Sequence, residues 1–220
     1  GLCDESRDIM VYLYHNWHDA DDLHKNAIIK NLDHLQVDPN EPTSLNRPPV
    51  NRYYKNDGAR FVYAFNNQEL IEKNYSEAYQ DIFVLTALNG KEYGTYLEIG
   101  AGDPTYGSNT FLLERKFKWT GIGIDFEPQF VQWHEQHRRN KVLQQDARQV
   151  DYNNLLNEIG INGVVDYLQI DCDPPNVSYD VLQKIPFDQW KFGVITYEHD
   201  YYCDETKSYR DLSRAFLKEK

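Results

Sequence analysis

The stretch 95–110, TYLEIGAGDPTYGSNT, decides the fold of this chain. Its first five residues, TYLEI, are aromatic or branched at most positions and predict a short buried strand. Gly100 and Gly102 then allow a tight turn in which the backbone can approach a ligand closely. The apolar and charged residues from Leu112 onward predict a helix. Strand, glycine turn and helix form a nucleotide-binding half-unit, in which the ligand lies beyond the carboxyl end of the strand.

The residues around the turn favour one kind of ligand. Glu98 lies just before the turn, and Thr105 stands where a dinucleotide-binding fingerprint would have its third glycine. A pyrophosphate needs bare amides and a helix N-terminus, whereas an acid suits a cationic amino group. S-Adenosylmethionine has an ammonium and a sulfonium and no phosphate, so it is the favoured cofactor. A structural turn without a ligand is the alternative.

Composition limits the number of domains and the partners. A chain of 220 residues, 40% hydrophobic, can bury one core with a small appendage beside it. The net charge of -12 argues against a nucleic-acid partner, and we interpret the basic run 137–141 as a solvated helix end. Three cysteines without CxxC spacing indicate reduced thiols and a cytoplasmic protein. No apolar run is long enough for a membrane span.

The first 60 residues differ from the rest and are predicted to form an N-terminal appendage, with residues 61–220 as the cofactor-binding domain. Residues 8–14 are strand-like, helical spacing follows, and residues 37–50 form a proline-rich connector. His18 and Asp22 could share a helix face and bind a metal, but a solvated acidic face is the favoured interpretation.

A helix is predicted after residue 76, before the glycine turn. Ser76 resembles its N-cap, and Ile82, Phe83 and Leu85 would form its buried face. This helix either lies across the mouth of the turn or only packs against the core.

Two further strands are predicted to end in acids on the cofactor side. Asp125 ends GIGID 25 positions after Gly100, near the distance at which doubly wound folds place a ribose-binding carboxylate. Asp146 follows the next short strand. It either accepts a hydrogen bond from an adenine amino group or caps a helix over residues 150–159.

The last two predicted strands end in polar residues that would meet in one pocket. Asp171 and Asp173 follow one strand, and Glu198 and His199 follow the other. We expect His199, or else Asp171, to act as the base, with Asp173 and Glu198 orienting it; Asp171, Asp173 and His199 could hold Mg²⁺ or Mn²⁺. Pro174 and Pro175 are expected to prevent an immediate helix.

These blocks together resemble the FkbM-type S-adenosylmethionine-dependent O-methyltransferases. The resemblance rests on YSEAYQD, YLEIGAGDPTYGSNT, GIGIDFEP, VVDYLQIDCDPP and FGVITYEHD in this order, and it covers residues 74–217. It implies a class I methyltransferase fold, an α/β Rossmann-like doubly wound sheet. It also implies that Asp171 and His199 face an acceptor hydroxyl. From the motifs and the resemblance together, the predicted cofactor-binding residues are Gln80, Glu98, Gly100, Ala101, Gly102, Asp103, Ser108, Asn109, Asp125, Phe126, Asp146 and Ala147.

The chain departs from the family pattern in two places. Asp171 is followed by Cys-Asp-Pro-Pro instead of Glu-Gly, so the acceptor side would differ. The antiparallel hairpin that usually closes such sheets has no counterpart before Lys220, which predicts a truncated hairpin or a short sheet.

The blocks are also similar to methyltransferase domains of glycan-building proteins from large algal viruses. That similarity implies a sugar or glycan acceptor, a larger multidomain glycan-synthesis protein and a location in the host cytoplasm. Two other classes stay open at this point: a nicotinamide-dependent oxidoreductase, and a non-catalytic glycan-binding module that uses the many Tyr and Trp residues.

Overall fold

The computed structural model describes residues 10–13, as backbone, together with residues 65–199 and 208–220. The predicted appendage helix, the proline-rich connector and the His18 and Asp22 pair all lie outside the described residues.

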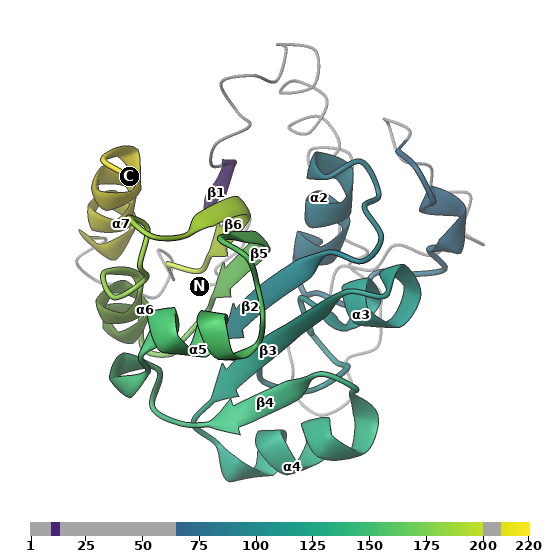
Figure 1. Cartoon of the computed structure of the whole chain (residues 1–220), viewed down its shortest axis with the longest axis horizontal. Coiled ribbons are helices and arrows are strands. Elements are labelled where there is room, and N and C mark those ends of the chain that lie inside the picture. Colours follow the sequence, from purple (N-terminus) through teal and green to yellow (C-terminus); the bar gives the residue numbers. More distant parts are fainter. Residues whose placement is uncertain (1–9, 14–64, 200–207) are drawn as a thin grey trace, which may run out of the picture.

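The fold is built on one six-stranded sheet in the order β1-β6-β5-β2-β3-β4 (Figure 1). The strands span Met10–Leu13 (β1), Thr95–Ile99 (β2), Thr120–Asp125 (β3), Lys141–Gln144 (β4), Val164–Ile170 (β5) and Lys191–Tyr197 (β6). Strands β2 to β6 are parallel, and β1 pairs antiparallel with β6. The chain builds outward from β2 through β3 to β4, and then returns to the other side of β2 with β5 and β6. The crevice between β2 and β5 is therefore a topological switch point, where open α/β sheets bind ligands.

Helices lie on both faces of this sheet. They span Gln80–Ala87 (α2), Phe111–Phe117 (α3), Pro128–His137 (α4), Tyr152–Glu158 (α5), Pro175–Leu182 (α6) and Ser208–Lys218 (α7), with short 3-10 turns at Gln68–Leu70 (η2) and Ala147–Gln149 (η3). Figure 1 shows α5, α6 and α7 grouped on one side of the strands and α2 and α3 on the other. This arrangement confirms the predicted α/β Rossmann-like fold.

Alternation along β2 divides the buried side chains between two cores. Leu97 and Ile99 pack with α5, α6 and α7, while Tyr96 packs with α2 and α3. Since successive strand side chains point to opposite faces, Glu98 also belongs to the α3 face. The side chain of Glu98 is thus directed away from the core formed by α5, α6 and α7.

Helix α6 contradicts one prediction. It begins at Pro175 with Pro174 as its N-cap residue, so the two prolines start a helix instead of preventing one. The first turn of a helix has free N–H groups in any case, and proline is well suited to that position.

The start of α2 differs from its prediction as well. Its N-cap residue is Tyr79 in a left-handed conformation. Ser76 lies three residues before that position, and its hydroxyl donates to the Asp81 carboxylate at 2.5 Å and accepts from Asp81 N, in the first turn of α2, at 3.3 Å. Ser76 also forms an isolated parallel bridge with Gly107. The segment before α2 therefore adjoins the glycine loop. As predicted, Ile82, Phe83 and Leu85 are buried.

The antiparallel neighbour of β6 comes from the N-terminal part of the chain. β1 fills this edge, and α7 is the element after β6 within residues 208–220. A strand within the run predicted at residues 8–14 is thus confirmed, but it belongs to the main sheet, whereas the sequence placed this run in an appendage. Across the described ranges, no helix combines the length and the apolar character that crossing a membrane requires.

Candidate functional site

A cleft of about 1280 Å³ lies beyond the carboxyl ends of the parallel strands. The segments that follow β2, β3, β4, β5 and β6 all contribute to its walls. Thirteen of the predicted site residues line it: Gln80, Gly100, Ala101, Gly102, Asp103, Asn109, Asp125, Phe126, Asp146, Ala147, Asp171, Asp173 and Glu198. The structure thus brings most of the predicted site together at the switch point.

Gly100 and Gly102 differ in the space that surrounds the position of a Cβ atom. Gly100 has a φ of +78°, and a Cβ there would lie 1.8 Å from the backbone oxygen of Asp171. Its N–H donates to the carbonyl of Ile124, so this residue closes the packing of β2 against β3 and β5. Gly102 has a φ of +56°, and a Cβ there would meet nothing within 4 Å. Gly102 therefore leaves open space against the cleft.

Asp125 joins the glycine loop to the end of β3. It is 8% exposed, one carboxylate oxygen accepts from Gly102 N at 2.7 Å, and the other accepts from Glu127 N at 2.8 Å. A carboxylate has about four acceptor positions, so both oxygens can accept further bonds from a ligand. Phe126, 68% exposed, and Phe130 add an apolar wall beside this acid. Phe130 was missed by the sequence analysis.

Asp146 lies at the next strand end and lines the cleft, so its contact with an adenine amino group stays a prediction. It caps η3 by accepting from Arg148 N, while Asp151 caps α5, so the proposed cap of a helix over residues 150–159 is wrong. Both oxygens of Asp146 also accept from the Arg148 guanidinium, and these hydrogen bonds lower the pKa of Asp146. Its neighbour Ala147 is buried against the same wall.

The acceptor side contains three of the four predicted catalytic residues. Asp171, Asp173 and Glu198 line the cleft, and the backbone N–H groups of Asp171 and Glu198 extend the sheet by donating to Ile99 and Ile170. His199 is buried beyond β6 and is not among the residues that line the cleft.

The predicted metal site is not assembled in this structure. In the described part of the chain, no three His, Cys, Asp or Glu side chains are grouped as metal ligands would be. Asp171, Asp173 and His199 therefore do not form the expected set for Mg²⁺ or Mn²⁺.

Glu98 and Ser108 lie beneath the cleft instead of lining it. Glu98 is buried on the α3 face of β2 and accepts from the Thr110 hydroxyl at 2.6 Å. Burial raises its pKa to about 7. Ser108 accepts from Phe111 N. Both residues shape the glycine loop from behind in this structure.

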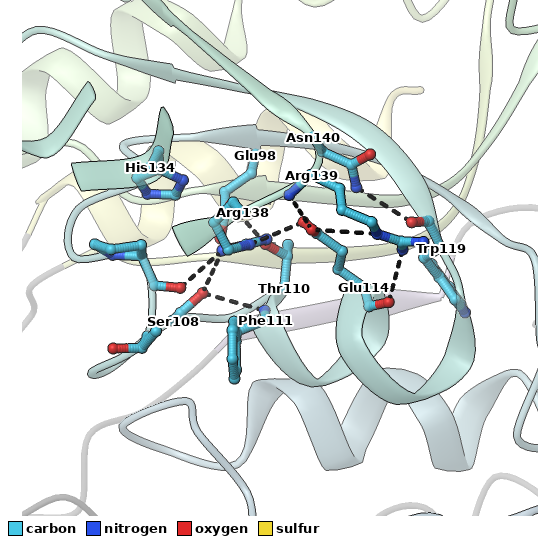
Figure 2. A network of polar contacts seen from close by, with 12 residues as sticks. Glu98, Ser108, Thr110, Phe111, Glu114, Trp119, His134, Arg138, Arg139 and Asn140 are labelled. Atoms are coloured by element: carbon cyan, nitrogen blue, oxygen red, sulfur yellow. Dashed lines mark hydrogen bonds and ion pairs between the residues drawn. The ribbon is translucent and has the colours of Figure 1, made fainter. Parts of the chain in front are cut away.

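Arg138 is the centre of this buried layer (Figure 2). Its side chain is 1% exposed, and all five of its N–H groups donate to oxygen acceptors. These acceptors are Glu114 Oε2, the Pro104 carbonyl, the Ser108 and Thr110 hydroxyls and the Tyr96 hydroxyl, at 2.7–3.2 Å. The interpretation of residues 137–141 as a solvated helix end is thus wrong for Arg138. The side chain of Arg139 is 63% exposed, but it also donates to the Glu114 carbonyl at 2.9 Å.

His134 supports the loop from α4. Its Nε2 lies 3.1 Å from the carbonyl oxygen of Gly102. Burial lowers the pKa of His134 to about 4, so the ring is neutral near pH 7 and Nε2 must carry the proton that it donates to the carbonyl. Neither His134 nor Arg138 was predicted, because each acts through a contact distant in sequence.

The charges around the cleft are strongly one-sided. Among its described lining residues there are eight carboxylates, from Glu77, Asp103, Asp125, Glu127, Asp146, Asp171, Asp173 and Glu198, and one cation, Arg148. The Oδ1 atom of Asn109 is buried in the same wall without a hydrogen-bond partner among the described residues. This lining favours a ligand with cationic nitrogen or sulfur over one with phosphates.

The fold and the site define an α/β protein with a Rossmann-like parallel sheet and an acidic cleft at its switch point. No protein-family model matches the chain, and no curated protein sequence matches it.

Proposed function

We propose that this protein is an S-adenosylmethionine-dependent O-methyltransferase of the class I type, acting on a hydroxyl of a sugar or glycan. The observation that carries the proposal is the carboxylate of Asp125, bonded to the N–H of Gly102 at the switch point of the sheet. This contact places an acid with remaining acceptor positions directly beside an open glycine turn. Such an acid can accept hydrogen bonds from the two hydroxyls of a ribose.

The loop and its helix favour this cofactor over a dinucleotide. Helix α3, which follows the glycine turn, begins at Phe111, nine positions after Gly102, so its N-terminus does not directly follow the turn. A pyrophosphate would lack the amide groups that such a terminus supplies, and it would face a lining with eight carboxylates. A nicotinamide-dependent oxidoreductase is therefore the weaker alternative.

The residues present fit the parts of S-adenosylmethionine. Asp125 would hold the ribose, while Phe126 and Phe130 would cover the adenine. The buried Oδ1 of Asn109 is an acceptor for the ammonium, a role that sequence reasoning gave to Glu98. The open space beside Gly102 lets the cofactor approach the backbone.

When bound, the cofactor supplies a methyl group on a sulfonium, whose C–S bonding pair stays on sulfur as the methyl group leaves. The chain has to align the acceptor oxygen with that methyl group and to take the proton that the oxygen loses as the new C–O bond forms. Asp171, Asp173 and Glu198 line the cleft at the strand ends where this proton would go, and we propose Asp171 as the base. Alignment would supply most of the rate gain, and the base about 10² to 10⁴ more.

Calorimetric titration with S-adenosylhomocysteine tests the proposal. We expect micromolar binding by the wild type, and a loss of at least about tenfold in Asp125→Asn, which keeps the size of the side chain but removes its charge and one of its two acceptor oxygens. Glu135→Gln, at an exposed position of α4 outside the lining of the cleft, is the control and should bind as the wild type does. The titrations are run with and without Mg²⁺ and Mn²⁺, and NAD is titrated in parallel.

The two cofactor classes give different results. Binding of NAD without S-adenosylhomocysteine would replace this proposal by the oxidoreductase. An Asp125→Asn variant that binds as tightly as the wild type would remove the residue on which the argument rests.

A further inference from the structure

The outer half of the glycine loop, from Asp103 to Asn109, has its own internal bonds. Asp103 Oδ1 accepts from the backbone N–H groups of Thr105 and Tyr106, at 2.9 and 2.8 Å. These bonds shape a local turn but do not fix its position relative to the sheet. That position depends on contacts with distant parts of the chain.

Arg138 makes two such contacts. Its Nη1 atom donates to the carbonyl of Pro104 at 3.0 Å and to the hydroxyl of Ser108 at 3.2 Å. The two acceptors lie four residues apart, near either end of the outer loop. Ser108 in turn accepts from the N–H of Phe111, the first residue of α3. One guanidinium thus connects both sides of the loop and, through Ser108, the start of the following helix.

Other bonds hold the guanidinium itself in place. Nε donates to Glu114 on α3 at 2.8 Å, and Nη2 donates to Thr110 and to the hydroxyl of Tyr96 on β2. Figure 2 shows Glu114 of α3 and Thr110, which precedes α3, beside the guanidinium of Arg138, which follows α4. A planar fork with five fixed donors can act as a rigid spacer, which a flexible lysine cannot replace.

The charges of the network also balance. Burial acts to raise the pKa of Glu114, but the charge and hydrogen bonds of Arg138 and its neighbours hold that pKa below its usual value, so Glu114 is ionised opposite the guanidinium. Replacing a buried ion pair by neutral groups of similar size often leaves stability unchanged, whereas removing one partner costs a great deal. A variant that replaces both Arg138 and Glu114 should therefore keep its stability, so that any remaining effect on the loop can be measured separately from an effect on folding.

We propose that Arg138 is a positioning residue for the ligand-binding loop, and that its bonds to Pro104 and Ser108 preset the shape of the cleft before a ligand binds. The alternative is that Arg138 only satisfies the buried Glu114. Only the measurement of ligand affinity rests on the proposed function, because the order of the loop can be measured without a ligand.

The experiment compares four full-length proteins at pH 6: the wild type, Arg138→Met, the charge-balanced double variant Arg138→Met with Glu114→Gln, and the control Arg115→Met at an exposed position of α3. Urea unfolding measures stability. Hydrogen exchange of the amides in residues 103–109, compared with those of β5, measures loop order. Calorimetry with S-adenosylhomocysteine measures affinity.

We expect Arg138→Met to lower the urea midpoint clearly and the double variant to recover most of that loss. The loop amides of the double variant should still exchange about tenfold faster than those of the wild type, with affinity weaker by about the same factor. Arg115→Met should resemble the wild type in all three measurements.

Recovery of loop protection together with stability in the double variant would overturn the proposal, because Arg138 would then act only on Glu114. If the wild type does not bind S-adenosylhomocysteine, the proposed function fails, and the exchange data alone decide whether Arg138 positions the loop.

Discussion

The buried carboxyl of Glu98 should make the stability of the protein depend on pH in an unusual direction. Burial raises the pKa of Glu98 from its ordinary value of 4.5 to about 7 in the folded protein. Between pH 4.5 and about pH 7, the carboxyl of Glu98 therefore takes up a proton when the protein folds. Its contribution to stability is fully present below about pH 4.5 and is lost as the pH rises through about 7.

The size of the effect follows from the same two values. Raising a pKa from 4.5 to about 7 corresponds to about 3 kcal/mol between the two ends of the range. The hydroxyl of Thr110, which donates to Glu98 at 2.6 Å, and the nearby charge of Arg138 both oppose the rise in this pKa. Both effects are already included in the pKa of about 7, so nothing further is subtracted from the figure of about 3 kcal/mol.

Glu98→Gln removes the titration while keeping the size of the side chain. Its amide oxygen can still accept from Thr110. We expect the variant to be close to the wild type in unfolding free energy at pH 5 and more stable than the wild type at pH 8, by up to about 3 kcal/mol. Urea unfolding at half-unit steps from pH 4.5 to 8.5 measures this difference, with Glu127→Gln on the exposed surface as the control.

Two results would refute this reasoning. A constant difference between Glu98→Gln and the wild type across the range would mean that Glu98 does not titrate there. A difference that grows toward acid pH would mean that Glu98 is ionised in the folded protein at pH 5, with its charge satisfied by Arg138.

Two further predictions concern the glycine loop. Gly100→Ala should lower the unfolding free energy by several kcal/mol, because its Cβ would lie 1.8 Å from the backbone oxygen of Asp171. Gly102→Ala should lower it by only about 1–2 kcal/mol, because its φ is positive but a Cβ there meets nothing within 4 Å. Similar urea midpoints for the two variants would contradict this difference. The pKa of His134, about 4 when folded and 6.5 ordinarily, predicts that its contribution to stability is lost as the pH falls from 6.5 toward 4. His134→Gln should reduce that acid loss, which unfolding at pH 7 and 4.5 can detect.

The sequence predicted the frame of the site well, because that frame follows from local patterns. Apolar runs that end in glycine or acid predicted the parallel strands, and parallel strands bring their carboxyl ends to one edge. Gly100, Asp125 and Asp171 therefore meet at the cleft as expected. The helix after Pro174 was missed because proline was treated only as a helix breaker, although it is common in the first turn.

The buried layer behind the cleft could not be predicted in this way. Arg138 belongs to a short basic run that is typical of an exposed helix end, and nothing in its neighbours indicates burial. Its acceptors come from residues up to 42 positions away, so only the folded arrangement identifies it. The same holds for His134, whose partner, the carbonyl of Gly102, is 32 positions distant.

Glu98 shows how strand geometry decides between two roles that the sequence left together. An acid two residues before a glycine turn was expected to contact the ammonium of a cofactor. Side chains alternate along β2, and the neighbours Leu97 and Ile99 face the core of α5, α6 and α7, so Glu98 points to the α3 face. There it meets the hydroxyl of Thr110 beneath the loop, outside the lining of the cleft. An acid in this position holds Thr110, the N-cap residue of α3, against β2, and the contact with the ammonium is proposed for groups beyond the turn, such as Asn109.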